Sequence, residues 1–399
     1  RRVLERDRKS FIVMEPAMKN ISYININMLN PNLWNGGIIV IMDVLLYLKS
    51  KGHYTESISF LCNDIYKYYI PINTSNTNFL IDENKKILCY RMKLKYIDFY
   101  QEILPINSYE LSERFQPALK RIFSIIYKKK IDYIITSDDD FISIFGAFLS
   151  GVPVVHWFNS LQNIVNCKEN NSFLRFLKQS HIFTISSFLQ YKLKEILNLD
   201  SVIWYPMFNI KKYKVKREKK SSKIIGYYSA GKLKGDDIVN RIIHKKDDWK
   251  FIIIGRDYLS KSNKVSSNLQ ILGNITNIEI FYKAIDILIV PSIIEEGFSR
   301  VIIEACVNGI TVIANKVGGI PEAMGNSGIM IDVNLEKELN FEAIADQYIF
   351  EIEKLFSDDK YYEIMSKKAL FRAEEYEDMQ NRLSEENYNK YIKPFLSSS

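Results

Sequence analysis

The stretch that decides the fold is AIDILIVPSIIEEGFSRVIIEAC, residues 284–306. Residues 284–290 form a short apolar run that is typical of a buried strand, and residues 300–307 repeat apolar side chains at helical spacing. The loop between these segments contains one glycine, Gly297. The order is therefore strand, loop and helix, with Glu296 just before the helix and Glu304 roughly two turns inside it.

This arrangement suits a ligand that carries both phosphates and hydroxyls. The first N–H groups of a helix are unpaired and partly positive, so the helix start at Phe298 and Ser299 favours a phosphate. Gly297 allows the backbone to approach such a ligand closely. A carboxylate such as Glu296 is unfavourable beside a phosphate unless it accepts hydrogen bonds from hydroxyls. A nucleoside-diphosphate sugar meets both requirements, because a sugar and a ribose flank its phosphates.

Glu296 and Glu304 are separated by seven residues, with Pro291-Ser292 before them and VGGIPE, residues 317–322, after them. The pattern resembles the E-x7-E motif of the retaining glycosyltransferases of family 4. The resemblance is close over about 60 residues and loose over most of the chain. It implies the α/β GT-B fold, in which two Rossmann-like domains face each other across a cleft and a C-terminal helix crosses back to the first domain.

A chain of 399 residues is expected to form two domains. The expected boundaries are an N-terminal extension (1–17), a Rossmann-like acceptor-binding domain (18–208), a basic linker (209–222), a Rossmann-like nucleotide-sugar domain (223–375) and a returning helix (376–399). The extension is a tag remnant, a partner arm or a short helix, and the sequence does not separate these. The linker is expected to be solvated, because its run of lysines has no apolar periodicity.

The resemblance assigns roles to several side chains. It implies that Glu296 holds the donor sugar, that Glu304 binds the ribose, and that His156, at the end of strand 151–157, touches the sugar from the first domain. Trp157 stands where the family usually has an aspartate, and the alternative for His156 is a buried core histidine. Gly36 and Gly37 match a glycine pair near the diphosphate, although a plain tight turn is the other interpretation.

A clamp for the diphosphate is expected in the turn after strand 223–228. Lys234, which precedes Gly235, matches the clamp lysine of the family. The family's clamp arginine falls near Ser229, so the second cation is open between this position, Lys232 and Arg256. The predicted catalytic residues are Glu296, His156 and Lys234, and the predicted donor-binding residues are Gly36, Gly37, Ser229, Lys232, Lys234, Arg256, Gly297, Phe298, Ser299 and Glu304.

Neither a metal nor a cofactor is expected, because Lys234 and the helix start supply the positive charge. The rival interpretation is the acidic run Asp138–Asp140, which follows strand 131–136. Hard carboxylate ligands there suit Mg²⁺ or Mn²⁺, as in the GT-A glycosyltransferases. Aspartates at a helix start are also common caps, and residues 141–149 are predicted to be the next helix.

Composition restricts the partners. The net charge of +7 favours acidic partners such as a nucleotide or an anionic membrane surface. The basic residues are not interleaved with aromatics in a nucleic-acid module, the four cysteines lack metal or redox spacing, and there is no run of about 18 apolar residues. A cytoplasmic protein is expected, with peripheral contact at the inner face of the cell membrane through the basic amphipathic helix 111–130 as one hypothesis. The alternative is that this helix packs its apolar stripe on the sheet.

The predicted reaction is retaining transfer of a hexosyl or deoxyhexosyl group from a nucleoside-diphosphate sugar to a hydroxyl of a glycan or lipid-linked glycan, in bacterial cell-surface polysaccharide synthesis. The base of the donor (UDP, GDP or dTDP) is left open. The alternatives are a GT-B sugar-nucleotide epimerase, for which this chain is histidine-poor, and a non-catalytic nucleotide-sugar-binding subunit.

Overall fold

The computed structural model describes residues 18–26, 36–62, 86–87, 97–104, 115–138, 141–168, 171–217, 224–255, 267–273, 275 and 277–397. The predictions that concern the extension (1–17), Asp139, Asp140, linker residues 218–222 and Arg256 therefore lie outside the described residues.

The described strands of the first domain form an eight-stranded sheet in the order β3-β4-β2-β1-β5-β6-β7-β8. All neighbours are parallel except β3, which is antiparallel to β4. The strands are β1 (Asn20–Ile26), β2 (Tyr54–Cys62), β3 (Lys86–Ile87), β4 (Ile97–Leu104), β5 (Tyr133–Ser137), β6 (Val154–Phe158), β7 (His181–Thr184) and β8 (Val202–Ile203). The helices are α1 (Gly36–Ser50), α3 (Phe115–Lys129), α4 (Phe141–Leu149), α5 (Leu161–Asn166), α6 (Asn171–Leu177) and α7 (Ser187–Leu197).

The second domain contains a six-stranded parallel sheet in the order β11-β10-β9-β12-β13-β14. The strands are β9 (Ile224–Tyr228), β10 (Lys250–Ile254), β11 (Leu269–Gly273), β12 (Ile287–Val290), β13 (Thr311–Asn315) and β14 (Ile329–Ile331). The helices are α8 (Ile210–Tyr213) in the linker, η4 (Lys232–Lys234), α9 (Asp236–Lys245), α10 (Glu279–Ala284), α11 (Arg300–Cys306), α12 (Ile320–Met324) and α13 (Phe341–Ser357).

The strand order fixes where a ligand can bind. β9 lies between β10 and β12, so the chain changes direction across the second sheet between β9 and β12. In open α/β sheets, the crevice at the carboxyl ends of such strands is the usual ligand site. The turn with Lys234 follows β9 and the loop with Glu296 follows β12, so the topology brings both to one crevice.

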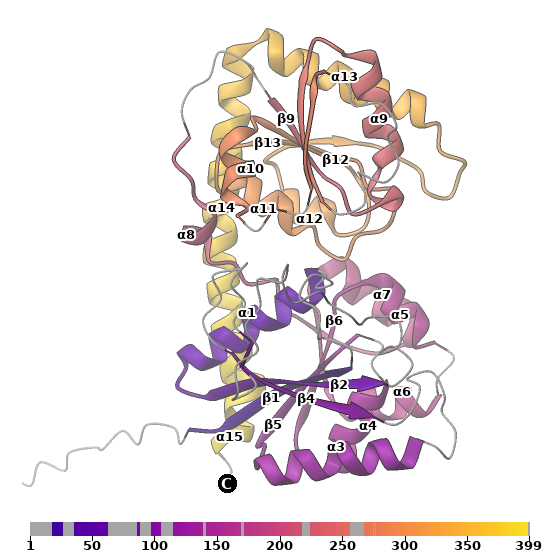
Figure 1. Ribbon diagram of the computed structural model, residues 1–399, viewed down its shortest axis with the longest axis vertical. Coiled ribbons are helices and arrows are strands. Elements are labelled where there is room, and N and C mark those ends of the chain that lie inside the picture. Colours follow the sequence, from indigo (N-terminus) through magenta and orange to yellow (C-terminus); the bar gives the residue numbers. More distant parts are fainter. Residues whose placement is uncertain are drawn as a thin grey trace, which may run out of the picture.

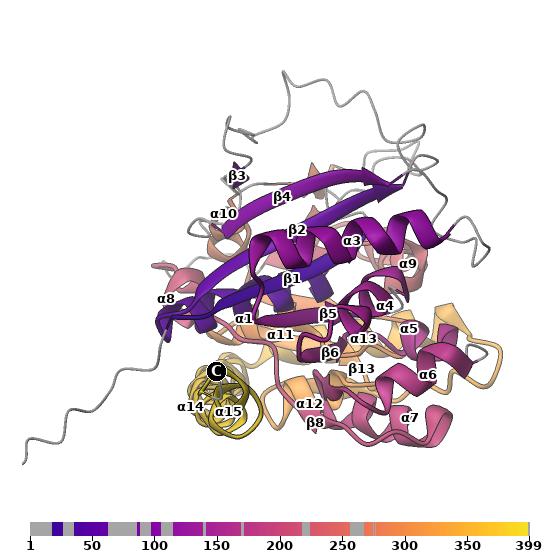
Figure 2. The ribbon, with the colours of Figure 1, turned by 90° about the horizontal axis from the view of Figure 1, so that it is seen from below.

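A long C-terminal helix joins the two domains. α14 (Asp359–Asn387) runs alongside both of them, and the π-helical turn Tyr388–Ile392 and α15 (Lys393–Ser397) end beside the first domain (Figures 1 and 2). Tyr376 Oη donates to the carbonyl of Pro206 at 2.6 Å, and Trp204 Nε1 donates to Ser384 Oγ at 3.1 Å. The GT-B arrangement, with its returning helix, is confirmed.

The linker differs from its expectation. Arg217, within the basic run, is only partly exposed and is paired: Nη2 lies 2.6 Å from Asp286 Oδ1, and Nη1 donates to the carbonyl of Asn308 at 3.0 Å. Tyr213 in α8 is also buried. The prediction of a solvated run was wrong for Arg217, because Asp286 and Asn308 offer acceptors that charge patterning does not reveal, whereas Lys214 and Lys216 are exposed as expected.

Candidate active site

The acidic loop, residues 291–299, connects β12 to α11 at the carboxyl edge of the second sheet. Its Glu296 carboxylate accepts a short hydrogen bond from Ser292 Oγ, and its Oε1 lies 2.6 Å from Lys234 Nζ. An ammonium carries three donors and a carboxylate four acceptor positions, so the pair can still bind other groups. The structure thus brings together the predicted sugar carboxylate and the predicted phosphate cation.

Gly235 allows the turn after β9 to pack closely against this loop. Its φ is 97°, and a Cβ here would lie 2.1 Å from the carbonyl oxygen of Pro291. Only glycine fits such a conformation at such a distance. The Lys234-Gly235 pair is therefore a packing requirement that places the ammonium beside Glu296, while Lys232, two residues earlier, is exposed.

Ser229 does not substitute for a clamp arginine in this conformation. Its Oγ donates to Asp236 Oδ1 at 2.8 Å, and its backbone N–H donates to the carbonyl of Ile254 at 2.8 Å. Tyr227 Oη donates to the same Asp236 oxygen at 2.7 Å. Ser229 is fully inside the domain and has no donor left for a diphosphate, so it stabilises the floor of the crevice.

Two glycines of the 317–322 motif support the acidic loop from behind. The backbone N–H of Gly319 donates to the carbonyl of Glu296 at 2.7 Å. A Cβ on Gly318 would lie 2.4 Å from that same oxygen, and a Cβ on Gly319 would lie 2.3 Å from the carbonyl oxygen of Gly297. The motif thus fixes the backbone that carries Glu296.

Gly297 faces the first domain. A Cβ on Gly297 would lie 2.4 Å from the carbonyl oxygen of Asn159, the first residue after β6. The sequence interpretation reserved this space for a ligand, whereas in the structure the missing side chain lets the two domains approach each other. Asn159 is a residue that the sequence interpretation missed, although its position directly after a parallel strand was a usable signal.

Asp138 holds Asn159 in place. The Asp138 carboxylate accepts from the backbone N–H of Asn159 at 2.9 Å and from Asn159 Nδ2 at 3.1 Å. The amide oxygen of Asn159 is buried and has no hydrogen-bond partner among the described residues. Within the part of the chain that the structure describes, no group of three or more His, Cys, Asp or Glu could hold a metal. Asp138 therefore acts as a positioning group for the end of β6.

His156 lies within β6 and has no exposed surface. Its Nδ1 is 2.9 Å from Thr136 Oγ1, and its ring packs edge-on against Phe158 and Phe173 at centroid distances of 4.7 and 5.8 Å. Burial lowers the pKa of His156 to about 3, against a smaller opposite effect of the Asp138 backbone. In this conformation the ring does not reach the crevice, which corresponds to the alternative of a core histidine.

Glu304 is held from two sides. Its Oε2 accepts from Tyr282 Oη at 2.7 Å, and its Oε1 lies 4.0 Å from Arg300 Nε, one helical turn away. Tyr282 is completely buried, and its burial and the Glu304 charge raise the pKa of its hydroxyl. The carboxylate predicted to bind the ribose is therefore fixed before any ligand arrives.

The remaining predicted donor-binding residues are buried or lie at the start of a helix. Phe298 is buried, with its ring 5.6 Å from that of Tyr376 on α14, so its side chain packs rather than lining the crevice. Ser299 is the N-cap residue of α11 and is also buried. Gly36 and Gly37 are the first two residues of α1 rather than part of a turn, and the loop before them lies outside the described residues.

A second contact between the domains involves Glu322. Its carboxylate accepts a hydrogen bond from the backbone N–H of Ser187 at 2.9 Å. Ser187 is the first residue of α7 in the first domain. It also accepts a short hydrogen bond from Tyr205 Oη. An acidic side chain at a helix N-terminus is stabilising because it pairs with unsatisfied N–H groups. The last residue of the sequence motif therefore joins the two domains.

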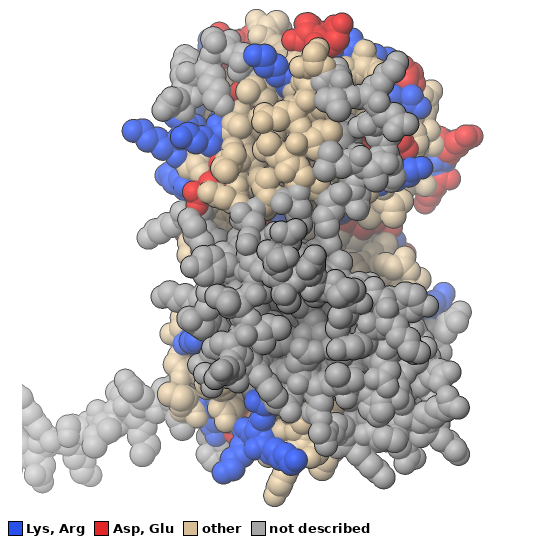
Figure 3. All heavy atoms as spheres, viewed as in Figure 1, with Lys and Arg blue, Asp and Glu red and all other residues tan. Residues whose placement is uncertain are grey.

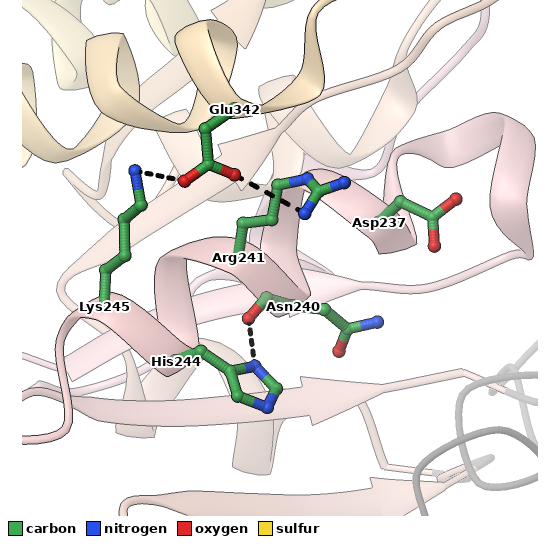
Figure 4. A pocket seen from close by; sticks show the side chains of 6 residues that line it. All are labelled: Asp237, Asn240, Arg241, His244, Lys245 and Glu342. Carbon is green, nitrogen blue, oxygen red and sulfur yellow. Dashed lines mark hydrogen bonds and ion pairs between the residues drawn. The ribbon is translucent and has the colours of Figure 1, made fainter.

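A separate groove of about 420 Å³ lies on the outer face of the second domain, between α9 and α13 (Figure 4). It is lined by Asp237, Asn240, Arg241, His244, Lys245 and Glu342. Lys245 Nζ and Arg241 Nη1 pair with Glu342 at 2.6 and 3.4 Å. None of the predicted site residues lines this groove, so its shape alone does not make it the active site.

With this geometry in place, comparison with known proteins identifies one segment. Residues 236–348 match the family model described as glycosyl transferases group 1. A segment of 115 residues is 30% identical to a lipopolysaccharide 1,2-N-acetylglucosaminetransferase of Salmonella typhimurium, covering 28% of this chain and 29% of that protein. The chain therefore matches less than a third of the length of this curated relative.

Solved structures resemble the whole chain. A glycosyltransferase from Rickettsia africae has a TM-score of 0.69 and 19% identity, covering 96% of this chain and all of that one. The Anabaena protein HepE in complex with UDP-glucose has a TM-score of 0.63 and 14% identity, covering 93% of this chain and 99% of that one. At these identities the likeness shows the fold, and the fold is GT-B.

Proposed function

We propose that the protein is a retaining glycosyltransferase that moves a sugar from a nucleoside-diphosphate sugar to a hydroxyl of a glycan or lipid-linked glycan. The observation that carries the proposal is the contact of Lys234 with Glu296 at 2.6 Å, at the carboxyl edge of the second sheet. Glu296 lies within the matched segment 236–348, and Lys234 lies two residues before it. The likeness of a 115-residue part of the chain to a lipopolysaccharide sugar transferase supports a role in cell-surface polysaccharide synthesis.

The reaction breaks the bond between the anomeric carbon and a phosphate oxygen and forms a bond from that carbon to the acceptor oxygen on the same face. The acceptor hydroxyl loses its proton to the departing phosphate. Lys234 stabilises the charge that develops on the diphosphate, which is the kind of preorganised electrostatic stabilisation that accelerates such steps. Glu296 holds hydroxyls of the donor sugar through its carboxylate.

The remaining contacts follow from the placement of each group. Glu304 binds the ribose hydroxyls, because Tyr282 and Arg300 already hold its carboxylate. We assign the first-domain contact with the sugar to Asn159 in place of His156, because Asn159 reaches the acidic loop while His156 is enclosed. The backbone at Gly36, Gly37, Phe298 and Ser299 lies near the phosphates.

No metal is required in this scheme, because the positive charge comes from Lys234. We expect activity to persist in excess EDTA. If EDTA abolishes activity and Mn²⁺ restores it, the acidic run at Asp138 gains the role that we give to Lys234.

The acceptor side of the proposal concerns α3. Its residues Ile122, Ile125 and Ile126 are buried, so the apolar stripe packs inside the domain and is not free to enter a membrane. Phe123 and Tyr127, on the opposite side, are exposed. Lys and Arg side chains gather at the end of the molecule where α3 lies (Figures 1 and 3). We propose that this face meets anionic lipid at the cytosolic side of a membrane. Flotation of the wild-type protein and of the double variant Phe123→Ser/Tyr127→Ser with anionic and neutral liposomes tests this proposal.

The decisive experiment measures nucleotide release from UDP-, GDP- and dTDP-sugars with and without glycan acceptors. The UDP series comes first, because HepE is solved with UDP-glucose. Release that depends on acceptor supports a transferase. Conversion of the donor sugar without acceptor supports an epimerase, and tight binding with no turnover for any acceptor supports a binding subunit.

A further inference from the structure

A buried charged cluster joins the two domains beside the acidic loop. Arg300, the first residue of α11, keeps only 9% of its side chain exposed, and its Nη1 lies 2.9 Å from Asp43 Oδ2. Asp43 belongs to α1 of the first domain, and 257 residues separate the two partners in sequence. The sequence interpretation gave neither residue a role.

The guanidinium of Arg300 touches three parts of the molecule at once. One edge meets Asp43 in the first domain. Its plane lies over the ring of Phe208, 4.2 Å from the centroid, in the segment that connects the domains. Its Nε lies 4.0 Å from Oε1 of Glu304. A planar cation with several donors can serve all three contacts, whereas a lysine cannot.

Burial makes this contact sensitive to domain separation. A charge removed from water is costly unless it is paired. Moving the first domain away would take Asp43 from Arg300 and leave the cation with Glu304 as its remaining carboxylate in this cluster. The cation would then shift relative to Glu304. Closure of the domains and the position of the cation beside Glu304 are therefore linked through the side chain of Arg300.

We propose that Arg300 is a positioning residue that couples nucleotide binding at Glu304 to closure of the two domains through Asp43. The proposal rests on the proposed function, because it takes Glu304 as a ligand of the donor nucleotide. Coupling between two equilibria is reciprocal, so a nucleotide that favours closure must bind less tightly when closure is weakened. A substitution at Asp43 in the first domain should then lower affinity at a site in the second.

Two variants separate the contact that holds the domains together from the contacts that position Glu304. Asp43→Asn removes the interdomain charge contact and leaves Arg300 intact. Arg300→Lys keeps a cation that can reach Asp43 but loses the planar contacts with Phe208 and Glu304. Asp286→Asn is the matched control, because it breaks the buried pair with Arg217 at 2.6 Å on the second-domain side of the molecule.

Two measurements on the full chain test the proposal: the radius of gyration by small-angle X-ray scattering, and the Kd for UDP, GDP and dTDP by calorimetry. We expect Asp43→Asn to enlarge the radius without nucleotide and to weaken the preferred nucleotide about threefold to tenfold. Arg300→Lys should keep the wild-type radius and weaken the nucleotide by a similar factor. Asp286→Asn should lower the melting temperature and leave radius and Kd unchanged.

The outcomes distinguish this inference from the proposed function. If wild type binds a nucleotide and Asp43→Asn binds it equally well with an unchanged radius, the coupling is wrong and the transferase proposal stands. If wild type binds none of the three nucleotides, the proposed function and the coupling both fail. A fall in affinity for Asp286→Asn equal to that for Asp43→Asn would show a general loss of stability and would also overturn the coupling.

Discussion

Two arginines of the second domain pair with carboxylates in different surroundings. Arg300 with Asp43 lies between the domains with side chains 9% and 18% exposed, whereas Arg241 with Glu342 lies in the outer groove with side chains 44% and 51% exposed (Figure 4). Exposed pairs contribute little because water and salt screen them, while breaking a buried pair leaves a charge without compensation. A charge change should therefore have a larger effect in the interdomain cluster than in the outer groove.

The largest expected effect is that of replacing Lys234, which contacts Glu296 at the carboxyl edge of the second sheet. Lys234→Ala should lower kcat/KM about 10- to 150-fold, because one contact with a charged group is worth about 1.5–3 kcal/mol. Lys234→Arg should restore part of the loss. Steady-state kinetics with varied donor measures both.

Lys245→Ala in the outer groove is the control, because it removes the same charge from an exposed position. It should leave kcat/KM at the wild-type value. Equal losses for the two lysines would mean that net charge, rather than the crevice, attracts the donor.

The buried His156 allows a second test, through the pH dependence of stability. The pKa of His156 is lowered to about 3 from 6.5, so the unfolded chain binds a proton below pH 6.5 that the folded chain does not. Its contribution to stability is complete above pH 6.5 and is lost as the pH falls toward 3. At pH 5 the loss is about 2 kcal/mol of unfolding free energy, since each pH unit is worth about 1.4 kcal/mol.

Urea unfolding at pH 7 and pH 5 tests this sign. The difference between the two pH values should be smaller in His156→Gln than in wild type. An undiminished difference in His156→Gln would assign acid sensitivity to other groups, such as His53 and His181, whose pKa values are also lowered by burial.

The two glutamates of the acidic loop and α11 should differ in which kinetic constant they change. Glu296→Gln should lower kcat about tenfold, because its contacts are near the reacting carbon, while Glu304→Gln should raise the apparent Kd of the donor about tenfold. Kinetics and calorimetry on the two variants separate these effects. Parallel changes in both constants in both variants would show that the polarity assigned to the site is wrong.

The second domain could be predicted further from sequence than the first. Apolar runs marked β9 and β12, and Gly235, Gly318 and Gly319 belonged to matched motifs whose packing partners the structure then supplies. Those partners lie in the same domain, because the carboxyl ends of its neighbouring parallel strands meet at one edge of the sheet. The fold class and the contact of Lys234 with Glu296 follow from the order of strand, loop and helix and from the strand arrangement.

The first-domain half of the site could not be read in the same way. β6 extends to Phe158, so His156 lies within the strand and Asn159 is the first residue beyond it. A shift of a few residues in a predicted strand end decides which side chain faces the crevice. The pair Asp43 and Arg300, like Glu322 with α7, joins distant parts of the chain, and no local pattern in one sequence indicates such a contact.

The smallest expected effect belongs to the outer groove. Glu342→Gln removes the carboxylate shared by Arg241 and Lys245, both of which remain partly in water. A surface change of this kind should shift the melting temperature by less than about 2 °C and leave nucleotide affinity unchanged. The melting temperature and the nucleotide Kd of Glu342→Gln are measured by thermal melts and calorimetry and compared with those of Asp43→Asn. A loss of affinity in Glu342→Gln equal to that in Asp43→Asn would contradict the distinction between the clusters, because it would require the exposed groove to influence a crevice whose residues it does not contact.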